Sequence, residues 1–145
     1  MKTAPGRDHR RKYILDTSAI FAFREDEEGC DKVESLLREA QAGEVEVYAS
    51  FMTYMEAYYR VIQIEGEEAA KSMYAELKSL PIYRVDVNEA ILLQAGEIKA
   101  KHRLSVAGAW IIATALNIEG TLVHRDPEFG QVEGKVSVLK LPYLT

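Results

Sequence analysis

Apolar residues along this chain follow two alternating spacings. Short β-prone runs lie at residues 13–15, 45–49, 83–87, 121–123 and 136–139. Between them, apolar residues recur every three or four positions, as on one face of a helix. These stripes are Cys30, Val33, Leu37 and Ala40; Met52, Met55, Tyr59 and Ile62; Ala70, Met73, Tyr74 and Leu77; Ile91, Ala95 and Ile98; and a nearly continuous run over 106–117. The alternation predicts an α/β fold of three layers, α/β/α, around a mainly parallel sheet of four to five strands.

Length and composition predict one domain behind a short tail. A chain of 145 residues can bury a core without disulfide or metal staples. Residues 1–11 contain Pro5 and Gly6 and show no periodicity, so we expect a flexible basic tail at 1–11 and a folded domain at 12–145. The single cysteine, Cys30, allows no internal disulfide, and no apolar run is long enough to cross a bilayer. These features predict a cytoplasmic protein with no membrane role.

The charge is unevenly distributed. Residues 1–12 contain five basic residues and one acid, whereas the whole chain carries −5, so the remainder carries −9. Such an acidic body does not suit a protein that coats nucleic acid with a general basic surface. It suits a domain that gathers carboxylates around metal ions and confines its basic residues to a rim.

Three acidic residues lie beside the ends of predicted strands. Asp16 closes the first strand, Asp126 follows the fourth, and Glu56 lies early in the helix after the second. Parallel sheets bind ligands at the carboxyl ends of their strands. Carboxylates gathered in one cleft repel each other unless a cation neutralises them, and Mg²⁺ and Mn²⁺ prefer such oxygen ligands. The pattern predicts a site for a divalent metal, which can activate water and stabilise charge on a phosphoryl group.

Each acid also has a purely structural interpretation. Asp16 is a residue type that caps a helix N-terminus. Glu56 and Arg60 have the i,i+4 spacing of a surface ion pair. Asp126, with a proline after it, is typical of a turn or of the cap of a short helix. The combination favours a site, because all three acids lie beside strand ends of one inferred sheet.

Four segments of the chain form an ordered pattern: I-L-D-T-S-A-I at 14–20, Glu56, A-G-A-W-I-I-A-T-A at 107–115 and L-V-H-R-D at 122–126. In this order they resemble the motifs of PIN domains, most closely those of VapC-type toxins of toxin–antitoxin pairs. The resemblance covers residues 12–139. It implies a Mg²⁺- or Mn²⁺-dependent endoribonuclease, usually a homodimer, inhibited by a small antitoxin in its active-site groove. It also implies that Asp16, Glu56 and Asp126 are catalytic metal-binding acids, and that Thr17 or Ser18 orients Asp16.

The resemblance implies a fourth acid at the position of Gly108. With Ser105 as N-cap, residue 108 is the third helical residue, where an acid would favour both the cap and the helix dipole. Glycine inside a helix instead costs about 1 kcal/mol relative to alanine, and a lost ligand should weaken the metal site roughly 10²-fold or more. Close packing is the structural explanation for the glycine. Glu128 and Glu133 could compensate, but the spacing places neither of them.

Other residues have two interpretations each. One group of basic residues could form a rim that binds an RNA backbone, or its members could simply be exposed to solvent at a helix end, where cations are favoured. The group comprises Lys99, Lys101, His102, Arg103, His124 and Arg125. Tyr54, Tyr58 and Tyr59 could stack on bases or pack inside the fold.

Two functions follow from the sequence. The principal hypothesis is a metal-dependent endoribonuclease of PIN type that hydrolyses RNA phosphodiesters, with an activity that Gly108 puts in doubt. The alternative is a degenerate, non-catalytic PIN domain that binds RNA or an antitoxin-like protein. A receiver domain or an aspartate-based phosphatase is disfavoured, because Asp16 has neither an adjacent acid nor the Asp-x-Asp pattern.

Overall fold

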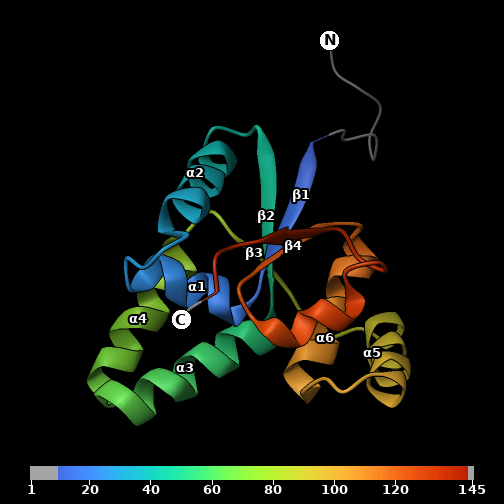
Figure 1. Ribbon diagram of the computed structural model, residues 1–145. Coiled ribbons are helices and arrows are strands. Elements are labelled where there is room, and N and C mark those ends of the chain that lie inside the picture. Colours follow the sequence, from blue (N-terminus) through green and yellow to red (C-terminus); the bar gives the residue numbers. More distant parts are fainter. Residues whose placement is uncertain (1–9, 144–145) are drawn as a thin grey trace.

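A five-stranded sheet forms the centre of the computed structural model, which describes residues 10–143 (Figure 1). The strands are β1 (Arg11–Leu15), β2 (Val45–Ser50), β3 (Tyr83–Val85), β4 (Thr121–His124) and β5 (Val138–Lys140). They lie in the order β3-β2-β1-β4-β5, and every neighbouring pair is parallel. The predicted parallel sheet is confirmed.

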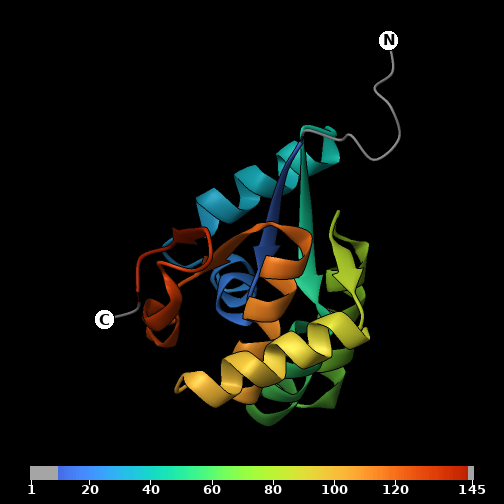
Figure 2. The same cartoon turned by 90° about the vertical axis from the view of Figure 1, so that its right-hand side faces the viewer.

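Helices cover both faces of this sheet. They are α1 (Thr17–Arg24), α2 (Cys30–Gln41), α3 (Phe51–Glu65), α4 (Glu67–Ser79), α5 (Glu89–Lys101), α6 (Val106–Ile118) and the 3₁₀-helix η1 (Pro127–Val132). Figure 1 shows α1, α2 and α4 to the left of the strands and α5 and α6 to the right, and Figure 2 shows α5 and α6 in front of them. The predicted three-layer arrangement is therefore confirmed.

Side chains of the central strands alternate between the two layers. Leu15 and Val123 pack into the larger apolar cluster, which includes residues of α1, α2, α3 and α4. Ile14 and Leu122 point the other way and pack with residues of α6 and η1. Because neighbouring residues of a strand face opposite sides, both faces of a sheet covered in this way must be apolar. This sandwich fixes the ends of β1 and β4 beside each other.

The stripe predicted on α3 is wrong about the buried face. Met55 and Tyr59 are 49% and 42% exposed. The residues that face the core are Thr53, Tyr54, Ala57 and Val61. Ten of the fourteen residues at 51–64 are apolar or aromatic, so the period alone does not select one face.

The predicted tail boundary also needs a correction. Residues 1–9 lie outside the described residues, but Arg11 is the first residue of β1 and not part of a tail. The Arg10 guanidinium donates a hydrogen bond to Glu46 at 2.9 Å. The folded domain therefore begins before residue 12.

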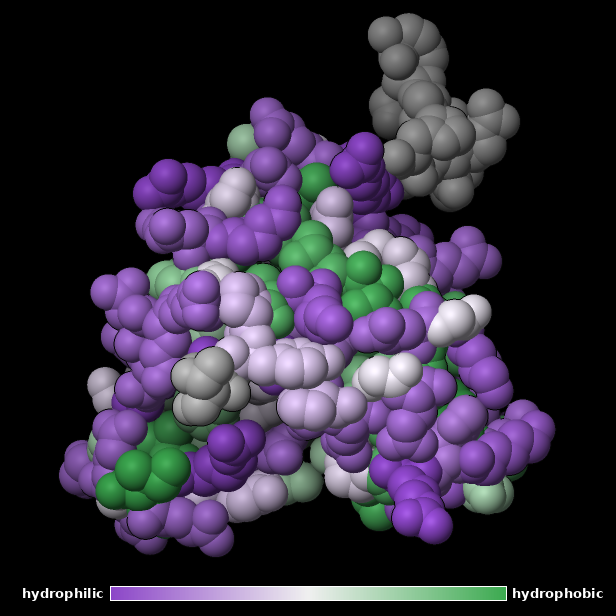
Figure 3. Space-filling view, viewed as in Figure 1, coloured by the Kyte–Doolittle hydropathy of each residue, from purple (hydrophilic) through white to green (hydrophobic). Residues whose placement is uncertain are grey.

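The surface is mostly polar in the view of Figure 3, with a hydrophobic patch at the corner where α3 meets α4. Ile64, at the end of α3, is 75% exposed. Among residues 10–143, no helix has both the length and the apolar character that a membrane span requires.

Two features favour glycine at residue 29, the start of α2: its backbone conformation and the close approach of Leu141. Its φ is +97°, and a Cβ there would lie 3.2 Å from Leu141 Cβ. Gly43 also has a positive φ, +80°, but its Cβ would meet nothing within 4 Å.

We expect Gly29→Ala to lower the free energy of unfolding by about 2–3 kcal/mol and Gly43→Ala by about 1 kcal/mol. Urea denaturation of the two variants measures the difference, and equal losses would show that Leu141 imposes no packing constraint.

Candidate active site

Asp16 stands at the end of β1 and caps helix α1. Its Oδ1 accepts hydrogen bonds from the Ala19 backbone N–H at 2.9 Å and from the Ser18 hydroxyl at 2.7 Å. The side chain is almost enclosed, with the residue only 2% exposed. The capping interpretation of Asp16 is therefore correct, and it leaves the carboxylate at the strand end where a site was predicted.

The protonation of Asp16 reflects its surroundings. Burial raises the pKa of this carboxyl to about 7, because the charged form loses its hydration. The hydrogen bonds from Ser18 and Ala19 act in the opposite direction, whereas the charges of Asp126 and Glu56 raise the pKa further. Asp16 thus lies close enough to both Asp126 and Glu56 for their charges to act on it.

Glu56 is held in the second turn of α3 by a residue of α1. The Thr17 hydroxyl donates a hydrogen bond of 2.6 Å to Glu56 Oε1. Thr17 therefore orients Glu56, while Ser18 contacts Asp16. The alternative ion pair with Arg60 is not found among the described residues; the Arg60 guanidinium instead lies 4.6 Å from the centre of the Phe21 ring.

Asp126 follows β4 and caps η1. Its Oδ1 accepts a hydrogen bond from the Glu128 backbone N–H at 3.0 Å, and its own backbone N–H donates to His124 Nδ1 at 3.0 Å. His124 is fully buried, and this burial lowers its pKa. A neutral imidazole that accepts through Nδ1 fixes the backbone from which the Asp126 carboxylate extends.

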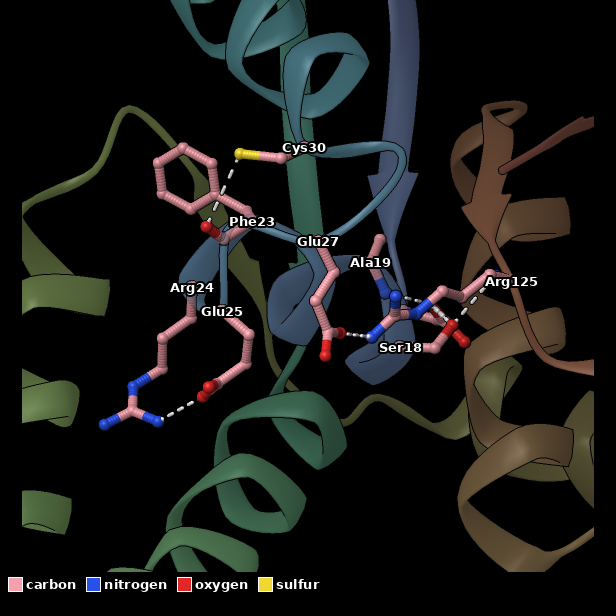
Figure 4. Close-up of polar contacts among 9 residues, drawn as sticks. Ser18, Ala19, Phe23, Arg24, Glu25, Glu27, Cys30 and Arg125 are labelled. Atoms are coloured by element: carbon pink, nitrogen blue, oxygen red, sulfur yellow. Dashed lines mark hydrogen bonds and ion pairs between the residues drawn. The ribbon is translucent and has the colours of Figure 1, made fainter. Parts of the chain in front are cut away.

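Arg125, which lies between His124 and Asp126, connects the end of β4 to α1. Its backbone N–H donates to the Ser18 hydroxyl at 2.9 Å, and its guanidinium forms an ion pair with Glu27 (Figure 4). Arg125 is only 8% exposed and His124 is buried. Of the two interpretations left open for the basic group, the basic rim does not apply to His124 and Arg125, because both are buried and serve packing and hydrogen bonding. Exposed basic residues remain at and just beyond the end of α5: Lys99, Lys101 and Arg103.

The tyrosines of α3 lie mainly away from the acids. Tyr54 and Tyr58 make edge-on contacts with Tyr74, with ring centroids 6.3 and 5.9 Å apart. Both border an open cavity of about 610 Å³ that also has Lys71 and Arg84 in its wall. At 100° per residue, these tyrosines occupy a different face of α3 from Glu56. Tyr54 packs inside the fold, and the cavity is separate from the acidic cluster.

The three acids offer oxygen donors suited to a hard cation. Within residues 10–143, Asp16, Glu56 and Asp126 each use one carboxylate oxygen in hydrogen bonds and leave the other without a protein donor. Such a donor set fits Mg²⁺ or Mn²⁺ chemically. The same described region contains no group of three acid, histidine or cysteine side chains placed closely enough to hold one metal ion together. The acids interact electrostatically without forming a ready-made ligand cage.

Gly108 has an acidic neighbour that the sequence did not reveal. Ser105 caps α6 by accepting the Gly108 backbone N–H at 2.9 Å. The Ser105 backbone N–H and hydroxyl in turn donate to Glu128 Oε1 and Oε2 at 2.8 and 3.0 Å. The Glu128 carboxylate therefore lies over the first turn of α6, beside Gly108. Glu133 is exposed and lies 3.9 Å from Lys140.

Comparisons with known proteins identify the family and the fold of this chain. The family model described as "PIN domain" matches residues 13–135. No curated protein matches the chain by sequence. Similar solved structures include VapBC2 from Rickettsia felis bound to a promoter DNA fragment, with a TM-score of 0.72, 16% identity and coverage of 90% of this chain and 98% of the other. DNA-bound VapBC from Salmonella typhimurium has a TM-score of 0.72, 18% identity and coverage of 90% and 98%.

A third similar structure is VapC20 of Mycobacterium tuberculosis, described as a toxin that cleaves the sarcin–ricin loop. Its TM-score is 0.65 at 18% identity, and the match covers 83% of this chain and 94% of that one. At these identities the likeness shows a shared fold.

Removing the charge of Asp16 should change how stability depends on pH. The folded pKa of about 7 lies above the ordinary 3.8, so the folded state binds the proton more tightly. The stability from protonation is fully present below about pH 4 and is lost as the pH rises through about 7. Between about pH 5 and pH 8, in EDTA, the wild-type chain should lose about 2–3 kcal/mol more than Asp16→Asn.

Urea denaturation at the two pH values measures this difference. Asp31→Asn, which removes an exposed acid of α2, should follow the wild-type profile. Parallel profiles for the wild type and Asp16→Asn would contradict the raised pKa of Asp16.

Proposed function

Because the chain belongs to the PIN domain family, we propose that it is a metal-dependent endoribonuclease of the VapC toxin type that hydrolyses RNA phosphodiesters. The observation that carries the proposal is the position of the buried Asp16 carboxylate, which stands at the end of β1 beside the end of β4 and interacts with the charges of both Asp126 and Glu56. A divalent cation would neutralise carboxylates arranged in this way and would bind to their oxygens.

In this proposal, Asp16, Glu56 and Asp126 hold Mg²⁺ or Mn²⁺ through the oxygens that accept no hydrogen bond from the described residues. The metal would activate water and stabilise the charge that develops on the phosphoryl group. The rest of the chain positions these acids: Ser18 fixes Asp16, and Thr17 fixes Glu56.

Cleavage of labelled RNA in the presence of Mn²⁺ tests the proposal. We expect cutting by the wild-type chain, loss of cutting in EDTA, and a decrease of roughly 10²-fold or more in Asp16→Asn, which keeps the cap but loses the charge. Asp31→Asn is the matched control and should cut like the wild type.

Cutting that persists in EDTA or in Asp16→Asn would overturn the proposal. Mn²⁺ binding without any RNA cleavage would favour the alternative, a non-catalytic PIN domain that binds RNA or an antitoxin-like protein.

The proposal extends to assembly: the chain forms a homodimer, and it binds an antitoxin-like protein. Two observations support it. Several similar structures are toxin–antitoxin complexes, and α3 leaves Met55 and Tyr59 exposed one turn apart on the same face, an apolar surface of the kind that marks protein contacts.

Light scattering behind a sizing column tests the dimer. We expect a mass of about twice the 16.3 kDa of one chain and a return toward one chain when Met55 and Tyr59 are both replaced by serine. Lys71→Ser, a polar replacement on α4, serves as the control. A monomer at every concentration would contradict the dimer.

A further inference from the structure

An acid from a distant part of the sequence, Glu128, contacts the first turn of α6. In a capping box, the N-cap side chain accepts the N3 backbone N–H, and an acid at N3 accepts the N-cap backbone N–H. Here Ser105 and Gly108 complete the first half at 2.9 Å. Glu128, twenty-three positions away, completes the second half by accepting the Ser105 N–H at 2.8 Å.

Gly108 provides the space for this arrangement. A Cβ at residue 108 would lie 2.7 Å from Glu128 Oε2 and 3.1 Å from Glu128 Cδ, closer than carbon and oxygen atoms approach without a shift. The Glu128 side chain could make room only by leaving its two hydrogen bonds with Ser105. A side chain at 108 and the present position of the Glu128 carboxylate therefore exclude each other.

We propose that Glu128 supplies the fourth carboxylate of the metal site, in the place where an acid at residue 108 would otherwise stand. This inference rests on the proposed function. Glu128 follows Asp126 by two residues, and its backbone N–H is bonded to the Asp126 carboxylate at 3.0 Å, so the two acids belong to one rigid turn. Each of the Glu128 oxygens accepts one hydrogen bond and keeps a further lone pair.

One consequence concerns the substitution that would restore the usual family acid. Gly108→Asp alone places a second carboxylate against that of Glu128, so it should weaken the fold rather than complete the site. The double variant Gly108→Asp/Glu128→Ala has one acid again at the start of α6 and also removes the group that a Cβ at residue 108 would strike. The two positions should therefore be strongly coupled, as expected for residues that share one space.

Titration calorimetry with Mn²⁺, combined with thermal denaturation, tests the inference on the full chain. We expect Glu128→Gln to bind Mn²⁺ about tenfold or more weakly than the wild type, while Glu133→Gln, the same change in an exposed acid of the same segment, binds like the wild type. Gly108→Asp should have a lowered melting temperature in EDTA, and the double variant should recover both the melting temperature and the Mn²⁺ affinity.

Two results would overturn the inference: Mn²⁺ binding in Glu128→Gln equal to that in Glu133→Gln, or effects of Gly108→Asp and Glu128→Ala that simply add. Failure of the proposed function has a different signature. In that case Asp16→Asn does not reduce the Mn²⁺ binding of the wild-type chain, and the result is the same whatever residue stands at 128. The metal role of Glu128 then fails together with the proposed function.

Discussion

The hydrogen bonds that meet at Ser18 join the parts of the site. Its hydroxyl donates to the Asp16 carboxylate and accepts the backbone N–H of Arg125, so one oxygen connects the end of β1 to the end of β4. The neighbouring Thr17 extends the connection to Glu56 on α3. Because these contacts are buried or half-buried, they hold their geometry better than surface contacts would. The positions of all three acids depend on the first turn of α1.

The fold could be predicted from the sequence because its strongest signal is local. Alternating strand and helix spacings gave the parallel sheet, and the strand-end positions of Asp16 and Asp126 followed from the topology. The prediction failed on α3, where ten of the fourteen residues at 51–64 are apolar or aromatic and where Met55 and Tyr59 are exposed. There the buried face is set by packing against α4 and α6, which the period of one helix cannot reveal.

The site was predictable only in part. Asp16, Glu56 and Asp126 could be predicted as candidates because each lies beside a strand end, but their hydrogen-bond partners could not be assigned. His124 and Arg125 were interpreted as surface cations, although desolvation and contacts from distant segments make both structural. Gly108 was interpreted as a loss, because the sequence shows the missing acid and does not show that Glu128 occupies the adjacent space. Contacts across 23 or more residues carry no local signal.

Capping and metal binding are not competing explanations for these acids. Asp16 caps α1, Asp126 caps η1 and Glu128 completes the cap of α6, so each of these acids accepts a hydrogen bond at a helix N-terminus. A helix N-terminus bears partial positive charge, which favours a nearby carboxylate. The caps therefore offset part of the repulsion among the acids before any cation binds. Each cap at Asp16 and Asp126 also uses only one carboxylate oxygen, so the same contact that stabilises the helix orients the other oxygen for a ligand.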